Sequence, residues 1–178
     1  IKCNGDNTTL VASVSSGTAP YTYLWSNGET TPSISVKAGS YSVTVTDSKG
    51  CSTTSETINI TEPSKLMMEV SFTPILCNGD QSTVTVSASG GTAPYTGTGS
   101  FSVSAGTYTY TVKDANGCEV SKEITITEPS KLMMEVSFTP ILCNGGQSTV
   151  TVSASGGTAP YTGTGSFSVS AGTYTYTV

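Results

Sequence analysis

The sequence contains no histidine, only one tryptophan and few charged residues, which make up 11% of the chain. Without histidine, the chain cannot build a Ser-His-Asp or Cys-His catalytic arrangement from its own residues. Charge is sparse, with a net of -5, and nucleic-acid binding needs clustered Lys and Arg. Paired CxxC motifs, which are typical of structural zinc sites, are also missing. The sequence therefore favours a protein that is not an enzyme, carries no metal or cofactor and binds no nucleic acid.

Long apolar runs are missing too, because no stretch approaches the roughly 18 residues that a membrane-spanning helix requires. What the chain has instead is serine and threonine, which together form about a third of it and mostly alternate with apolar residues. Disordered chains are rich in charge and poor in β-branched residues, and this chain shows the opposite. We therefore expect a folded β-protein with no membrane span in this segment.

The chain repeats itself. Residues 60–112 recur as residues 126–178 with one difference, Asp80 against Gly146, and a looser copy begins near Cys3. Self-similarity at a nearly fixed spacing is the signature of a tandem array of small structural units. We predict a first repeat over residues 1–61 that lacks its first strand, a complete second repeat over 62–127, and a third repeat over 128–178 that lacks its last strand.

Within the middle repeat, apolar residues alternate with polar ones, which is typical of half-buried strands. Short, evenly spaced strands separated by turn residues favour an all-β fold, a tandem array of small antiparallel immunoglobulin-like β-sandwiches, with a small barrel as the alternative. Between Tyr21 and Ala38 the first repeat carries seven extra residues, which predict an added strand ending in an Asn27-Gly28 turn. The alternating apolar positions are 68, 70 and 72; 84, 86 and 88; 101 and 103; 108, 110 and 112; and 120, 124 and 126.

Five cysteines are present, two for each complete repeat. We predict disulfides inside the repeats, Cys3 with Cys51 and Cys77 with Cys118, because the separations of 48 and 41 differ by the seven residues of the extra hairpin. Cys143 would then pair with a partner beyond the end of this sequence. Disulfides in small repeated units indicate an oxidising, extracellular compartment. Free buried thiols are the alternative interpretation.

Few side chains are candidates for binding. Tyr23 and Trp25 lie on one face of the added strand, and the ligand they would suit is a sugar ring; packing in a sandwich core is the favoured alternative. Aspartates occur in turns, where a calcium ion would need several converging oxygens and each turn offers one carboxylate. Asp and Asn that cap their own backbone explain these turn positions as well.

Several motifs together resemble the SprB repeat. They are residues 17–31 (GTAPYTYLWSNGETT), residues 38–47 (AGSYSVTVTD), Gly50-Cys51, the upstream Cys3-Asn4-Gly5 and the downstream residues 60–63 (ITEP). The resemblance covers the first repeat almost completely. It covers the other two with a gap, because residues 95–101 lack the Trp-Ser-Asn-Gly hairpin.

This resemblance implies a secreted or cell-surface protein, since SprB repeats occur in very large surface proteins of Bacteroidota, including a gliding-motility adhesin exported by type IX secretion. The expected function is a structural and adhesive tandem-repeat segment, and a carbohydrate-binding surface module is the alternative. Expected partners are neighbouring repeats of the same chain, identical chains in an extracellular filament, and surface polysaccharide. Short Thr-Glu-Pro-Ser joints, with proline fixing φ, favour a semi-rigid stalk.

Overall fold

The computed structural model describes residues 1–178 and contains fifteen β-strands and no α-helix, which confirms the all-β prediction. No helix of the length and apolar character needed to cross a membrane occurs. The strands of the first repeat are β1 (Thr8–Val11), β2 (Thr22–Trp25), β3 (Ser33–Val36), β4 (Gly39–Tyr41), β5 (Val43–Thr46), β6 (Ser52–Thr54) and β7 (Ile58–Ile60); those of the second are β8 (Met67–Phe72), β9 (Ser82–Ser89), β10 (Gly99–Val103), β11 (Gly106–Lys113) and β12 (Glu119–Ile126); those of the third are β13 (Met133–Phe138), β14 (Ser148–Ser155) and β15 (Gly165–Val169).

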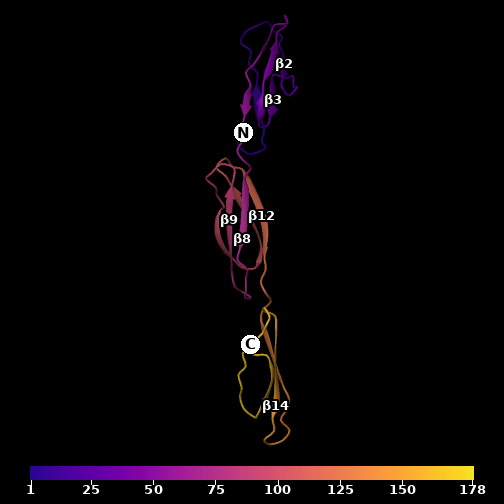
Figure 1. The fold of residues 1–178 in the computed structure, drawn as a ribbon, viewed down its shortest axis with the longest axis vertical. Helices are drawn as coiled ribbons and strands as arrows, with labels where there is room; N and C mark the ends of the chain where they lie inside the picture. Colours follow the sequence, from indigo (N-terminus) through magenta and orange to yellow (C-terminus); the bar gives the residue numbers. More distant parts are fainter. The chain divides into compact units, whose positions relative to one another are not determined.

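All the sheets are small, with two or three strands each (Figure 1). The first repeat holds the orders β1-β3, β2-β5-β6 and β4-β7, and the middle repeat holds β10-β9-β8 and β11-β12. The third repeat holds β13-β14-β15. Antiparallel pairing is seen wherever the register is defined, for example Trp25 opposite Val43. The immunoglobulin-like arrangement of these sheets stays a prediction.

Two compact units make up the chain. One contains residues 1–69, 86–98 and 110–122, and the other contains residues 70–85, 99–109 and 123–178. The division passes through the middle repeat, so the repeat boundaries expected after residues 61 and 127 also stay predictions.

The core of the first repeat lies in the first unit and is built around the added hairpin. Trp25, Ile34, Val36 and Val43 are buried together, because alternate residues of β2, β3 and β5 point to the same side. The indole Nε1 of Trp25 donates a hydrogen bond to the carbonyl oxygen of Thr31 at 2.8 Å, which satisfies its one polar atom. The seven extra residues therefore form the expected strand, and its function is to fill the core.

In the second unit, β14 shows the cleanest alternation, with Ser148, Val150 and Val152 buried and the residues between them exposed. β13 pairs along one edge of β14 and β15 along the other. The buried hydroxyl of Ser148 donates to the carbonyl oxygen of Thr139 at 2.6 Å, so it leaves no unpaired polar group. β9 has the same sequence and the same alternation as β14, as the repeat predicts.

Candidate functional site

A disulfide joins Cys3 to Cys118 across 115 residues of sequence, with the two Cα atoms 5.7 Å apart. Cys3 opens the first repeat, and Cys118 stands immediately before the last strand of the second. The bond therefore connects two successive repeats within the first compact unit.

This bond corrects the predicted pairing. Cys3 does not pair with Cys51, and Cys77 does not pair with Cys118; Cys51, Cys77 and Cys143 are free and exposed. The prediction was wrong because it compared separations inside one repeat, whereas the fold places the Cys3 turn beside the following repeat. Pairing of Cys143 with a cysteine beyond this sequence stays a prediction.

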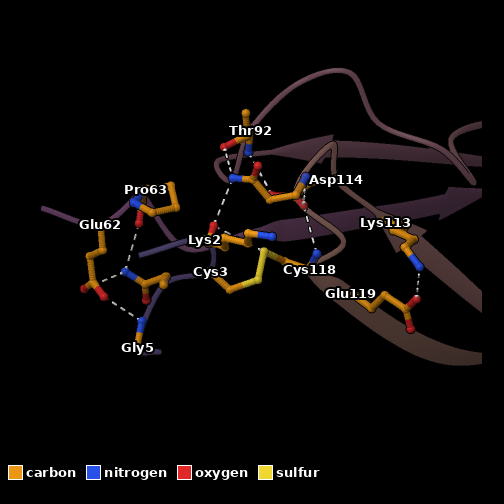
Figure 2. Close-up of a disulfide and its surroundings, with 12 residues drawn as sticks. Lys2, Cys3, Gly5, Glu62, Pro63, Thr92, Lys113, Asp114, Cys118 and Glu119 are labelled. Atoms are coloured by element: carbon orange, nitrogen blue, oxygen red, sulfur yellow. Dashed lines mark hydrogen bonds and ion pairs between the residues drawn. A yellow bond between two sulfur atoms is a disulfide. The ribbon is translucent and has the colours of Figure 1, made fainter. Parts of the chain in front are cut away.

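The turn that carries Cys3 is held against the joint between the repeats by Glu62 (Figure 2). The backbone N–H of Gly5 donates to Oε2 of Glu62 at 2.7 Å, and Nδ2 of Asn4 donates to Oε1 of Glu62 at 2.9 Å. Asn4 Nδ2 also donates to the carbonyl oxygen of Pro63 at 3.1 Å. We call the Cys-Asn-Gly turn, together with the Glu-Pro of the joint, the clasp. Hydrogen bonds to an ionised carboxylate are stronger than neutral ones, so the clasp fixes the direction in which Cys3 points.

The second unit contains a second clasp, which shares two of the three hydrogen bonds of the first. Gly79 N donates to Oε2 of Glu128 at 2.7 Å, and Nδ2 of Asn78 donates to the carbonyl oxygen of Pro129 at 3.1 Å. Each of these distances equals its counterpart in the first clasp. The clasp is therefore a repeated feature of the chain, formed once at each Thr-Glu-Pro-Ser joint.

Asp114 organises the other side of the disulfide. Its side chain is 5% exposed and accepts hydrogen bonds from the backbone N–H groups of Thr92, Asn116 and Cys118, each at 2.9 Å. Burial raises the pKa of this carboxyl, but hydrogen bonds from the N–H groups of Thr92, Cys118, Asn116 and Gly117 outweigh it, so the pKa lies below its ordinary value. The ionised carboxylate thereby positions Cys118.

Asn116 adds a contact from this turn to the first repeat. Its Nδ2 donates to the carbonyl oxygen of Lys2 at 3.0 Å and to Oγ1 of Thr92 at 2.9 Å. The residue next to Cys3 is therefore tied to the turn that carries Cys118, independently of the disulfide. Sequence reasoning missed Asn116, because Lys49 occupies the corresponding position of the first repeat and no pattern marks it.

Asp47 forms the same turn in the first repeat, with Cys51 in the place of Cys118. Hydrogen bonds from the backbone N–H groups of Cys51 and Thr18, and less strongly from that of Lys49, lower the pKa of Asp47 despite some burial. The carboxylate oxygens of both turn aspartates are thus already occupied by N–H donors. No group of three or more Cys, Asp or Glu side chains is arranged to hold a metal ion. These turns are explained by backbone capping.

The candidate ligand residues are not presented to solvent as a pair. Trp25 is 2% exposed and central to the first-repeat core, and Tyr23 packs against the same cluster. Stacking on a sugar ring needs an exposed aromatic face, so Trp25 is not available as a sugar platform. The alternative weighed from the sequence, packing in the core, is correct for Trp25.

These features define a class: an all-β tandem-repeat protein in which a disulfide and a repeated clasp connect successive repeats. The family model of the SprB repeat matches the chain three times, over residues 1–30, 70–96 and 136–162. The chain therefore carries three SprB repeats and belongs to the SprB repeat family. This is a structural repeat family of surface-exposed, adhesin-like proteins, not an enzymatic one. A search of curated proteins found no match.

Proposed function

We propose that this chain is a tension-bearing segment of a large secreted protein that forms a cell-surface adhesin or an extracellular filament. The observation that carries the proposal is the Cys3–Cys118 bond, which joins one repeat covalently to the next. A protein that only displayed a binding site would need no covalent bond between its repeats. An adhesin under mechanical load would need such a bond, because a non-covalent joint opens first when the chain is pulled.

The covalent topology determines where tension travels. Force applied to the two ends of the chain enters at Cys3, crosses the disulfide and continues from Cys118, so the 115-residue segment between them is not stretched. At about 3.5 Å per residue, the protected length is about 400 Å. The clasp contributes by holding the Cys3 turn in place.

Membership in the SprB repeat family supports the surface location, and the disulfide supports an oxidising compartment. The resemblance to surface proteins of Bacteroidota that leave the cell by type IX secretion makes that route, and a contribution to gliding or adhesion, the finer part of this proposal. Its proposed partners are neighbouring repeats of the same chain and identical chains in a filament; surface polysaccharide, expected from the sequence, is not carried into the proposal. A carbohydrate-binding module is not proposed, because the aromatic residue that would have carried it is buried.

Two measurements test the proposal. Single chains pulled from both termini should release about 400 Å more contour length after reduction by dithiothreitol than before it. The Cys51→Ser variant, which removes a free thiol, serves as the control and should behave like the original chain. Equal release with and without reductant would refute the mechanical function. Antibodies against residues 60–112 should label intact source cells or the filaments they release; labelling only after permeabilisation would refute the location.

A further inference from the structure

The disulfide between Cys3 and Cys118 can be reached from solvent. Both cysteines are half-buried, and a depression with a volume of about 260 Å³ lies directly beside the bond. Lys65 and Glu119 contribute opposite charges to the wall of this depression. Glu119 is paired with Lys113 at 3.0 Å, so the charge that the depression offers to a ligand is that of Lys65. The depression therefore suits a small anionic molecule, and the group that such a molecule meets there is a disulfide.

The turn that carries Cys3 is tied to the second repeat by a path that does not use the disulfide. In the clasp, Asn4 Nδ2 donates to the carbonyl oxygen of Pro63 at 3.1 Å. The next residue of the joint is Ser64, whose carbonyl oxygen accepts a hydrogen bond from the backbone N–H of Gly91 at 2.8 Å. Since Gly91 belongs to the second repeat, these contacts hold the Cys3 turn against that repeat whether or not the sulfur–sulfur bond is present.

The path continues to Cys118 through the buried carboxylate of Asp114. This carboxylate accepts hydrogen bonds from the backbone N–H groups of Thr92, the next residue along the loop, and of Cys118, each at 2.9 Å. Asn116 adds a direct tie, because its Nδ2 donates to the carbonyl oxygen of Lys2 at 3.0 Å. All of these residues belong to the first compact unit. Hydrogen bonds alone therefore hold the two cysteines close together in the folded chain.

We propose that the Cys3–Cys118 bond is an exchangeable link, which small anionic thiols of the glutathione class open and which forms again because the fold keeps the two cysteines side by side. When the link opens, the bond between the two cysteines breaks, a disulfide forms between two glutathione molecules, and their two protons pass to the cysteines. Oxidised glutathione drives the reverse reaction. The attacking species is the thiolate, which the positive charge of Lys65 attracts to the depression.

This inference rests on the proposed function and deepens it, because it assigns a regulation to the bond that carries tension. With the bond closed, the 115-residue segment between Cys3 and Cys118 is not stretched. With the bond open, only hydrogen bonds hold the two repeats together, so a pulled chain lengthens. When the tension falls and the chain refolds, the same hydrogen bonds bring the thiols together, and oxidation restores the original length.

The first test measures how strongly the fold holds the two thiols together. It uses the full chain with Cys51, Cys77 and Cys143 replaced by serine, equilibrated with mixtures of reduced and oxidised glutathione. Alkylation and mass spectrometry give the fraction of closed chains, and hence the effective concentration of one thiol for the other. This concentration should exceed about 1 M in buffer, against at most about 1 mM in concentrated urea, where the thiols are joined by an unordered chain. Equal values in the two solvents would overturn the proposal.

Matched substitutions in the two clasps identify the residues responsible. Glu62→Gln replaces the carboxylate that accepts from Gly5 and Asn4 by a neutral amide. It should lower the effective concentration about tenfold, because hydrogen bonds to an ionised acceptor are the stronger ones. Glu128→Gln makes the same change in the second clasp, away from the disulfide, and should leave the value unchanged. Equal values for the two variants would show that the clasp does not hold Cys3 for exchange, which contradicts the proposal.

The charge of Lys65 is tested by the rate of opening with two thiols. Lys65→Gln should slow opening by glutathione about threefold, because the anionic thiol loses the attraction of this charge. Opening by cysteamine, whose ammonium group offsets the charge of its thiolate, should keep its rate. Lys131→Gln, at the corresponding position of the second joint, is the matched control and should change neither rate. Equal slowing of both thiols by Lys65→Gln would overturn the selection of anionic thiols.

Repeated pulling of single chains distinguishes this proposal from the proposed function. In reduced glutathione, the chain should release about 400 Å of additional contour length, as the protected segment becomes stretched. After relaxation and transfer to oxidised glutathione, the additional length should no longer be released. If the length is released under reduction but the bond does not form again, the tension-bearing function stands and the exchangeable link is refuted. If reduction releases no additional length, both are refuted.

Discussion

Removing the disulfide between the half-buried Cys3 and Cys118 should destabilise the chain strongly, and the length of the loop that it closes gives the size of the effect. The Cys3→Ser, Cys118→Ser double variant opens a loop of 115 residues. In the chain-entropy model, closing a loop of this length stabilises the folded state by about 5 kcal/mol at 25 °C. Hydrogen bonds of Asn4, Gly5 and Asn116 remain in the variant, so its native contacts change little.

Urea denaturation followed by circular dichroism would measure this effect. The midpoint should fall and the slope should rise, because the unlinked unfolded chain exposes more surface than the crosslinked one. The Cys51→Ser and Cys77→Ser variants remove free exposed thiols and should leave both values unchanged. A loss below about 1 kcal/mol would refute the entropic reasoning, since it would mean that the unfolded chain is hardly restricted by the bond.

Other predictions follow from single side chains. The pKa of Asp114 is lower in the folded chain than its ordinary value of 3.8. The ionised carboxylate should therefore stabilise the fold above pH 3.8, and this stabilisation should be lost as the pH falls through the folded-state pKa. In acid denaturation, the Asp114→Asn variant should not show this pH dependence. Gly90→Ala should destabilise more than Gly79→Ala, because an added Cβ lies 2.0 Å from the carbonyl oxygen of Lys65 at the first position and meets nothing within 4 Å at the second; equal thermal midpoints would contradict this. Gly79→Ala itself should cost about 1 kcal/mol, since its φ of 90° is unfavourable for alanine. Trp25 should emit at short wavelength and resist quenching by iodide, and a quenchable, red-shifted emission would show that it is not in the core.

Much of the fold could be predicted from the sequence because period-2 alternation is a local signal. The strands around Val84 and Val86, and the added strand that ends at Trp25, occur where the alternation indicates them. Burial of Trp25 could also be expected, because its face of β2 carries Tyr23 and opposes Val43. These features depend on neighbouring residues and on one face of a strand, both of which the sequence displays directly.

The disulfide could not be predicted in the same way, because cysteine spacing says nothing of which turns lie side by side. A usable signal was nevertheless present: a Cys-Asn-Gly turn and a Thr-Glu-Pro joint recur together in the chain. A glutamate recurs at each joint and a glycine N–H group recurs on each turn, so the two can be matched as acceptor and donor. The structure shows this pairing between Glu62 and Gly5 and between Glu128 and Gly79. Motifs that recur together indicate which residues are partners, whereas the sequence separation of two cysteines gives only the length of the loop between them.

Residues 106–112 and 172–178 show most directly where local sequence stops determining structure. The two segments have the same sequence, and only the first is a strand. Alternating threonine and tyrosine give both segments the same β-propensity, and in the second repeat this segment is a strand that pairs with β12. Because Cys118 lies just before β12 and is bonded to the preceding repeat, the residue that links two repeats and the strand that closes one of them belong to a single short segment.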